Sequence, residues 1–186
     1  MKNIALFASG SGTNVENIIN YFESKSISNQ YLILVNNQNA KVIEKAEKRN
    51  LPVLIFDRNM LNDGAVSQKL EQFQPDLIVL AGFLWKFPDD LVKKYPNKVI
   101  NIHPALLPKY GGKGMYGHHV HTAVVENKEK ESGITIHYVN ENYDEGAVIF
   151  QASTPIEPSY TPEEVGAAVL KLEHLHFPQV IEKLLF

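Results

Sequence analysis

The tetrapeptide Asn101-Ile102-His103-Pro104 carries the side chains best suited to chemistry in this chain. Alternate side chains of an extended strand point the same way, so Asn101 and His103 would share one face. An amide can donate a hydrogen bond to an oxyanion, and an imidazole can do the same or move a proton near neutral pH. A strand end with a structurally satisfied histidine would have the same sequence, so the tetrapeptide alone leaves both interpretations open.

A second candidate group is the carboxylate of Asp144, in the turn Asn142-Tyr143-Asp144-Glu145-Gly146. A carboxylate placed beside His103 would raise the pKa of the imidazole and keep the charged form available. Nothing in the sequence itself shows that Asp144 reaches His103.

A loop rich in glycine and serine, Ser9-Gly10-Ser11-Gly12-Thr13-Asn14, precedes the first expected helix. Glycines allow a close approach of the backbone, and a helix N-terminus attracts anions, so a phosphate site is favoured over an ordinary tight turn. The dinucleotide fingerprint is incomplete, because Val15 stands where its third glycine belongs and residues 35–38 contain no acid for a ribose. The Gly-Lys-Ser/Thr sequence of a P-loop is also missing.

The other histidines have less specific surroundings. Residues 118–121 contain three histidines but no neighbouring acid or cysteine, so we expect no metal there. His137 is expected to be structural, because it alternates onto one face of its strand.

The elements that must position these groups alternate between strand and helix. Apolar runs predict strands at 3–8, 30–35, 53–56, 77–81 and 98–102, and helical periodicity predicts helices from Thr13 (with Glu16 as a capping box), at 40–49 and around 66–73. The run at 77–81 is apolar at every position, as in a parallel strand covered on both faces. The pattern predicts an α/β fold with a doubly wound, mostly parallel sheet and helices on both faces.

The rhythm changes after residue 102. A stretch rich in glycine and histidine (103–121) leads into a short helix ending near 127, a half-exposed strand at 134–138 and a strand at 147–152. Thr161, Pro162 and Glu164 predict the start of a last helix, which Pro178 is expected to kink or break. We expect one domain, 1–186, in which 1–102 is a phosphate-binding half and 103–186 completes the site.

Composition excludes several classes of protein. The chain has 186 residues, 44% of them apolar, and no cysteine, which excludes disulfide frameworks and thiolate chemistry. A net charge of -3 disfavours a nucleic-acid partner. No apolar run is long enough for a membrane span and no signal peptide is evident, so we expect a cytoplasmic protein with no membrane partner. The oligomeric state cannot be read from the sequence.

Five segments together resemble the folate-dependent formyltransferase family: residues 9–14, 75–83, 101–108, 144–149 and 173–178. The resemblance runs from Ile4 to about Ile181, and the loop at 9–14 is similar to the glycinamide ribonucleotide branch. It implies a formyltransferase-type Rossmann-like fold. It also implies transfer of a formyl group from the co-substrate 10-formyltetrahydrofolate to the amine of glycinamide ribonucleotide, in purine biosynthesis and without a metal.

The resemblance also implies a division of labour among the residues. Gly12, Thr13 and Asn14 would hold the substrate phosphate, and Glu173 would contact the glycinamide portion. The catalytic residues would be Asn101, His103 and Asp144. The folate would be bound by Leu84, Trp85, Lys86, Phe87, Asn101, Asn140, Tyr143 and Asp144.

The chain departs from the family pattern at three places. Trp85 stands where many relatives have an arginine, and Arg58 is the nearest candidate for the arginine that meets the folate tail. Residues 111–117 form a longer stretch than in many relatives and are expected to be a flap near the substrate.

The alternative functions are formylation of an amino sugar nucleotide or of methionyl-tRNA, or a dinucleotide-binding module. An enzyme that acts on tRNA would need a basic surface.

Overall fold

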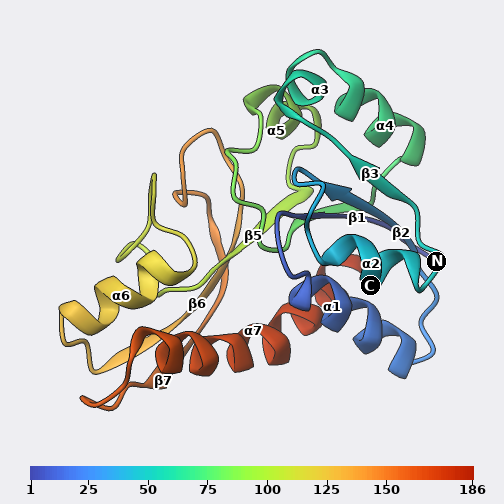
Figure 1. Ribbon diagram of the computed structural model, residues 1–186. Helices are drawn as coiled ribbons and strands as arrows, with labels where there is room; N and C mark the ends of the chain where they lie inside the picture. The colour runs from blue at the N-terminus through green and yellow to red at the C-terminus, as the bar shows by residue number, and fades with distance from the viewer.

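A seven-stranded sheet forms the middle of the computed structural model, which describes residues 1–186 (Figure 1). The strand order is β3-β2-β1-β4-β5-β6-β7. Strands β1 to β5 are parallel, and β6 and β7 are antiparallel to their neighbours. The strands are β1 (Asn3–Ala8), β2 (Gln30–Val35), β3 (Val53–Ile55), β4 (Leu77–Leu80), β5 (Val99–His103), β6 (Glu131–Tyr138) and β7 (Val148–Pro155).

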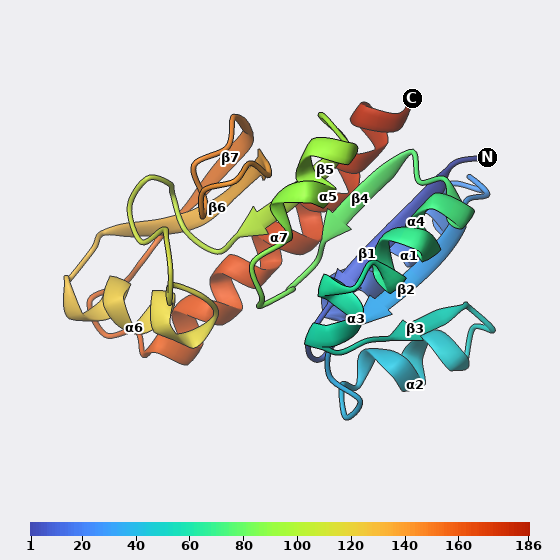
Figure 2. The ribbon, with the colours of Figure 1, turned by 90° about the horizontal axis from the view of Figure 1, so that it is seen from above.

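Helices cover both faces of this sheet. They are α1 (Thr13–Ser24), α2 (Val42–Glu47), α3 (Arg58–Asn62), α4 (Ala65–Phe73), α5 (Asp89–Lys94), α6 (His118–Glu126) and α7 (Pro162–Leu185). Figure 1 shows α1 and α7 below the sheet and α3, α4 and α5 above it. Seen from above, α7 runs from the region of α6 and β7 back toward the first strands (Figure 2). The predicted doubly wound, mostly parallel α/β architecture is confirmed.

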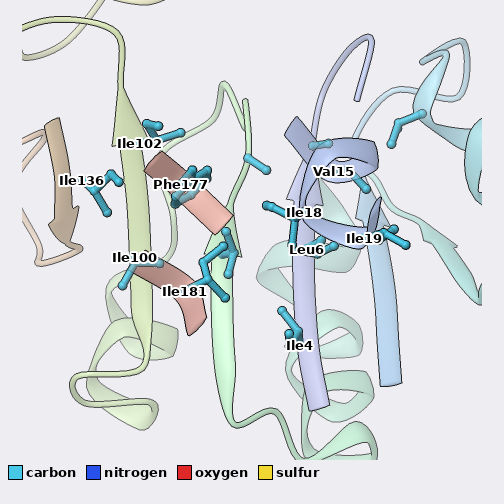
Figure 3. Packing of buried hydrophobic residues seen from close by; sticks show 14 of the residues in the cluster. Ile4, Leu6, Val15, Ile18, Ile19, Ile100, Ile102, Ile136, Phe177 and Ile181 are labelled. Carbon is cyan, nitrogen blue, oxygen red and sulfur yellow. The ribbon is translucent and has the colours of Figure 1, made fainter. Parts of the chain in front are cut away.

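The hydrophobic core consists of one cluster on each face of the sheet. The larger, of 27 buried residues, joins Ile4 and Leu6 of β1 to Ile18 of α1 and to Phe177 and Ile181 of α7 (Figure 3). The smaller, of 14 residues, lies under α3, α4 and α5. Because β1 and β2 are buried on both faces, nearly all their positions are apolar, and this explains why the sequence predicted them well.

The strand order reverses between β1 and β4. The chain moves outward from β1 through β2 to β3, returns to β4 on the other side of β1, and continues outward to β5. Helices and loops that leave β1 and β4 therefore diverge, which opens a crevice at the carboxyl ends of these strands. The loop of residues 9–14 and the end of β5 both meet this crevice.

Two details of the predicted helices are wrong and one is confirmed. Helix α1 is capped by Gly12 in the left-handed conformation, with no side-chain cap, so Thr13 and Glu16 form no capping box. Helix α7 continues through Pro178 to Leu185, because apolar contacts of Phe177 and Ile181 hold both sides of the proline in the core. The capping box of Thr161 and Glu164 at the start of α7 is confirmed.

Strand β6 is buried on both faces, whereas the sequence predicted it to be half-exposed. Its polar Thr135 has no exposed surface, because its hydroxyl donates to the carbonyl of Ala105 at 2.7 Å and accepts from the amides of Leu107 and Gln151. Two short helices, α3 and α5, were not predicted. No helix combines the length and the apolar character that crossing a membrane requires.

Candidate active site

A cavity of about 640 Å³ lies in the crevice at the carboxyl ends of the central strands. This volume is typical of a site for a small organic ligand. Ser11, Thr13 and Asn14 line it from the first half of the chain, and His103, Asp144 and Glu173 line it from the second. Both halves therefore build the same cavity.

Asn101, His103 and Asp144 all line this cavity, although only the family resemblance had grouped Asp144 with the other two. His103 is 3% exposed, and its Nδ1 lies 3.6 Å from Oδ2 of Asp144. Asp144 reaches it from the loop between β6 and β7, where its backbone has a φ of +56°. Its carboxylate also accepts a hydrogen bond of 2.9 Å from the backbone N–H of Gly112.

His137 is a further member of this cluster that the sequence analysis assigned to structure only. Its Nδ1 donates to the carbonyl of Tyr138 at 2.9 Å, because a carbonyl can only accept, and Nε2 is 3.2 Å from Nδ2 of Asn101. Oδ1 of Asp144 lies 3.6 Å from the same Nε2. Antiparallel pairing sets Asn101 opposite His137, and this register was the missing signal.

Burial and charge set the protonation of these groups. Burial lowers the pKa of His103 below its ordinary value, and nearby Asp144 and the Tyr110 carbonyl only partly oppose it. Asp144 does raise this pKa, as expected, but the larger effect of burial makes the net shift downward. Burial alone would raise the pKa of Asp144, but the neighbouring His137 and His103 side chains and the hydrogen bond from the Gly112 amide together lower it. At neutral pH the cluster holds a neutral His103 and an ionised Asp144.

The loop of residues 9–14 brings the N-terminus of α1 to the cavity. Ser11, Thr13 and Asn14 line it, and the first N–H groups of a helix favour an anion there. Gly12 also has a packing role, because a Cβ added to it would lie 2.3 Å from Cγ2 of Val42. The glycine lets α2 pack against the loop.

Glu173 extends from α7 toward the same loop. Its carboxylate accepts a hydrogen bond of 2.6 Å from Nδ2 of Asn14. Burial raises the pKa of Glu173, and the hydrogen bond from Asn14 opposes this only in part. Oδ1 of Asn14 is buried without a partner in the protein, so it is an acceptor available at the cavity wall.

The chain is similar over most of its length to proteins of one known family. Residues 2–181 match the family model described as formyl transferase. The chain belongs to the formyl transferase family. It is 37% identical to the chloroplastic phosphoribosylglycinamide formyltransferase of Arabidopsis thaliana, over 97% of this chain but only 64% of that protein, so it spans less than two thirds of that relative.

Other relatives have nearly the same length. The phosphoribosylglycinamide formyltransferase of Bacillus subtilis is 36% identical over 100% of this chain and 95% of its own. The crystal structure of glycinamide ribonucleotide transformylase 1 from Geobacillus kaustophilus superposes with a TM-score of 0.90, at 33% identity and over 100% of both chains. The predicted fold class and family are thereby confirmed.

One wall of the cavity is the segment 84–87, whose residues were expected to bind folate. Leu84, Trp85, Lys86 and Phe87 all line the cavity. Ser9 fixes the segment, because its hydroxyl accepts a hydrogen bond of 2.9 Å from the Leu84 amide. Asn140 and Tyr143 line the cavity from the loop that carries Asp144. No pattern in the sequence indicated that Ser9 would hold this wall through the Leu84 amide.

Arg58 and Trp85 lie together near this wall. The guanidinium carbon of Arg58 is 4.3 Å from the centre of the Trp85 ring, which is a cation–π contact. Trp85, which departs from the family pattern, and Arg58, the candidate for the arginine at the folate tail, are thus neighbours in space.

The histidines at 118–121 divide between surface and cavity. His118 lies 3.8 Å from Glu163, and His121 lines the cavity with its Nδ1 buried and without a partner in the protein. No group of three or more histidine, cysteine, aspartate or glutamate side chains is arranged to hold a metal ion.

Proposed function

We propose that the chain transfers the formyl group of 10-formyltetrahydrofolate to the amine of glycinamide ribonucleotide, giving formylglycinamide ribonucleotide and tetrahydrofolate in purine biosynthesis. The observation that carries the proposal is one cavity with three different parts. It joins the N-terminus of α1, the buried cluster of Asn101, His103 and Asp144, and the wall of residues 84–87. The names of the relatives from Arabidopsis thaliana and Bacillus subtilis support the same activity.

The cluster would stabilise the transition state of acyl transfer. The substrate amine attacks the formyl carbon, and the formyl oxygen becomes an oxyanion. Nδ2 of Asn101 has a second hydrogen to donate besides the one directed at His137, and it stabilises that charge. His103 shares with Asp144 the one proton that the attacking amine releases, and in its protonated form it adds positive charge beside the oxyanion.

Asp144 would handle the proton. The attacking amine loses a proton and the leaving nitrogen of the folate gains one, so the ionised carboxylate accepts it and returns it. Both substrates are held next to each other, and direct transfer needs no covalent enzyme intermediate.

Binding would be divided between the ends of the cavity. Gly12, Thr13 and Asn14 present the helix N-terminus to the phosphate, and Glu173 contacts the glycinamide portion. The folate lies along Leu84, Trp85 and Phe87, with Lys86, Asn140 and Tyr143 at its edges. Arg58, held on the Trp85 ring, is the cation nearest to this wall for a carboxylate of the folate tail.

A spectrophotometric assay of tetrahydrofolate release tests the proposal. We expect activity with glycinamide ribonucleotide and none with methionyl-tRNA or an amino sugar nucleotide. The dephosphorylated substrate should react much more slowly, because the remote phosphate positions the amine. Asp144→Asn serves as the inactive control. A better rate with an amino sugar nucleotide would overturn the choice of substrate, and binding of NADH instead of folate would favour a dinucleotide module. The cytoplasmic location stays a prediction.

A further inference from the structure

The ring of His103 is held by the backbone of Tyr110. Nε2 of His103 lies 2.7 Å from the carbonyl oxygen of Tyr110. A carbonyl oxygen can only accept, so Nε2 carries the proton and donates it. Neutral imidazole has one N–H, which leaves Nδ1 unprotonated and facing Asp144 at 3.6 Å. The Tyr110 carbonyl therefore selects the tautomer of His103.

The backbone of Tyr110 is itself unusual, because its φ is +56°. A residue with a Cβ adopts this left-handed conformation only when its surroundings impose it. The hydroxyl of Tyr110 donates a hydrogen bond of 2.9 Å to Oε1 of Glu129, and Nζ of Lys109 contacts the same oxygen at 3.0 Å. These two hydrogen bonds lower the pKa of Glu129 and keep it a charged acceptor.

The Tyr110 ring is half-buried and packs against the larger core cluster, but packing does not enclose it fully. A second cavity of about 290 Å³ lies beside it, lined by Tyr110, Glu129 and Ser132 among others. Atoms that face a void have no partners on that side. Core packing therefore holds one side of the ring, and the hydrogen bond to Glu129 fixes its hydroxyl end beside the void.

The same short segment also holds Asp144. The amide of Gly112 donates to Oδ2 of Asp144 at 2.9 Å. Gly111, between Tyr110 and Gly112 in the chain, is tightly packed, because an added Cβ would lie 2.6 Å from Cδ2 of Leu107 and 3.4 Å from Cβ of Asp144. A displacement of Tyr110 would therefore disturb both side chains of the proposed catalytic pair.

We propose that Tyr110 and Glu129 are positioning residues: the Glu129 carboxylate anchors the Tyr110 hydroxyl, so that the Tyr110 carbonyl fixes the tautomer and orientation of His103. The inference rests on the proposed function only in naming the reaction that His103 serves. Glu129 lies in the connection between α6 and β6, does not line the main cavity, and would act on the chemistry through Tyr110.

The first test observes the tautomer directly. Nitrogen NMR of the ¹⁵N-histidine-labelled full chain, at a pH where His103 is neutral, should show a protonated Nε2 and an unprotonated Nδ1. In Tyr110→Phe and in Glu129→Ala, the two His103 resonances should move toward the averaged values of mixed tautomers. A His103 protonated on Nδ1 in the parent protein, or unchanged resonances in both variants, would overturn the proposal.

The second test uses kinetics. Tyr110→Phe and Glu129→Ala should each lower kcat about tenfold, because a small misplacement of a reacting group is costly, with each KM changed less than about twofold. The double variant should be no slower than either single variant, since both break the same link. Multiplicative losses, or losses confined to KM, would contradict the proposal.

Two matched variants separate positioning from folding. Glu129→Gln keeps an oxygen acceptor for Tyr110 and should restore most of kcat and the parent tautomer. Lys109→Ala removes only the other partner of Glu129. Because the Lys109 side chain is 68% exposed, this variant should leave kcat and the His103 resonances unchanged. Loss of activity in Glu129→Gln equal to that in Glu129→Ala would overturn the anchor. If the parent protein does not formylate glycinamide ribonucleotide, the proposed function fails, and the tautomer measurement still decides the anchor.

Discussion

The two carboxylates in the cavity, Asp144 and Glu173, differ in their tendency to ionise because their surroundings differ. His103 is buried and Glu173 is half-buried, and the loss of solvent shifts the pKa of each in the direction that favours its neutral form. Asp144 is also half-buried, yet contacts with His137, His103 and the Gly112 amide keep it ionised. One carboxylate is thus suited to take a proton while the other favours its protonated form.

This division predicts the effect of removing the reacting groups. His103→Ala and Asp144→Asn should each reduce kcat at least about a hundredfold, the usual worth of a positioned acid–base group or oxyanion donor. The double variant should lose much less than the product, because the two side chains act as a unit. Single-turnover rates measure the loss, and melting temperatures close to that of the parent protein exclude misfolding. Strictly multiplicative losses would show independent roles.

Glu173 gives a prediction for stability against pH. Its pKa is raised above the ordinary value of 4.5, so folding favours its protonated form. The stability it contributes is complete below about pH 4.5 and is lost as the pH rises through the raised pKa. Glu173→Gln is neutral throughout and still offers Asn14 an acceptor. Its melting temperature relative to the parent protein should therefore increase as the pH rises from 4.5 to 8.

Glu182 on the same helix is a control of opposite sign. Hydrogen bonds from Lys25 and Tyr21 lower the pKa of Glu182, so its contribution to stability is present above about pH 4.5 and is lost as the pH falls. The melting temperature of Glu182→Gln relative to the parent protein should therefore decrease as the pH rises. Differential scanning calorimetry from pH 4 to 8 compares the two variants. Parallel trends in both would contradict the assignment for Glu173.

At the scale of single elements, local sequence patterns predicted what they alone determine. The long apolar runs of β1 and β2 needed no knowledge of their neighbours, and Asn101 and His103 share a face through simple alternation. Helices α3 and α5 were missed because five or six residues are too few to show a helical period. The place of His137 depends on the pairing of β5 with β6, which no local pattern encodes.

The loop before α1 shows how an element boundary restricts its residues. Gly12 combines a φ of +68° with a Cβ direction blocked by Val42, whereas an added Cβ on Gly10 would meet nothing within 4 Å. Gly12→Ala should therefore lower the free energy of unfolding by about 2 kcal/mol or more, and Gly10→Ala should change it by less than about 0.5 kcal/mol. Urea titrations provide both values. Equal effects of the two alanines would refute a packing role for Gly12.

At the scale of the whole molecule, the two halves of the chain share one core as well as one cavity. Helix α7 belongs to the second half but packs its Phe177 and Ile181 against the same cluster as Ile4 and Ile18 of the first (Figure 3). The sheet is also continuous from β4 through β5 to β6. Residues 1–102 alone therefore lack part of the cover for one face of their own strands, because α1 shares that face with α7. This is the basis for proposing a single domain over 1–186.

A single domain predicts that a change in α7 reaches every part of the fold. Phe177 has no exposed surface, and Phe177→Ala should lower the free energy of unfolding by about 3–5 kcal/mol, the usual cost of such a cavity. Far-UV circular dichroism reports all helices, and fluorescence of Trp85, the only tryptophan, reports the first half. Both midpoints in urea should shift together in the variant, since cooperative unfolding leaves no half intact. A shift seen by circular dichroism without one at Trp85 would mean that the first half folds without α7, and that two units, rather than one, build the cavity.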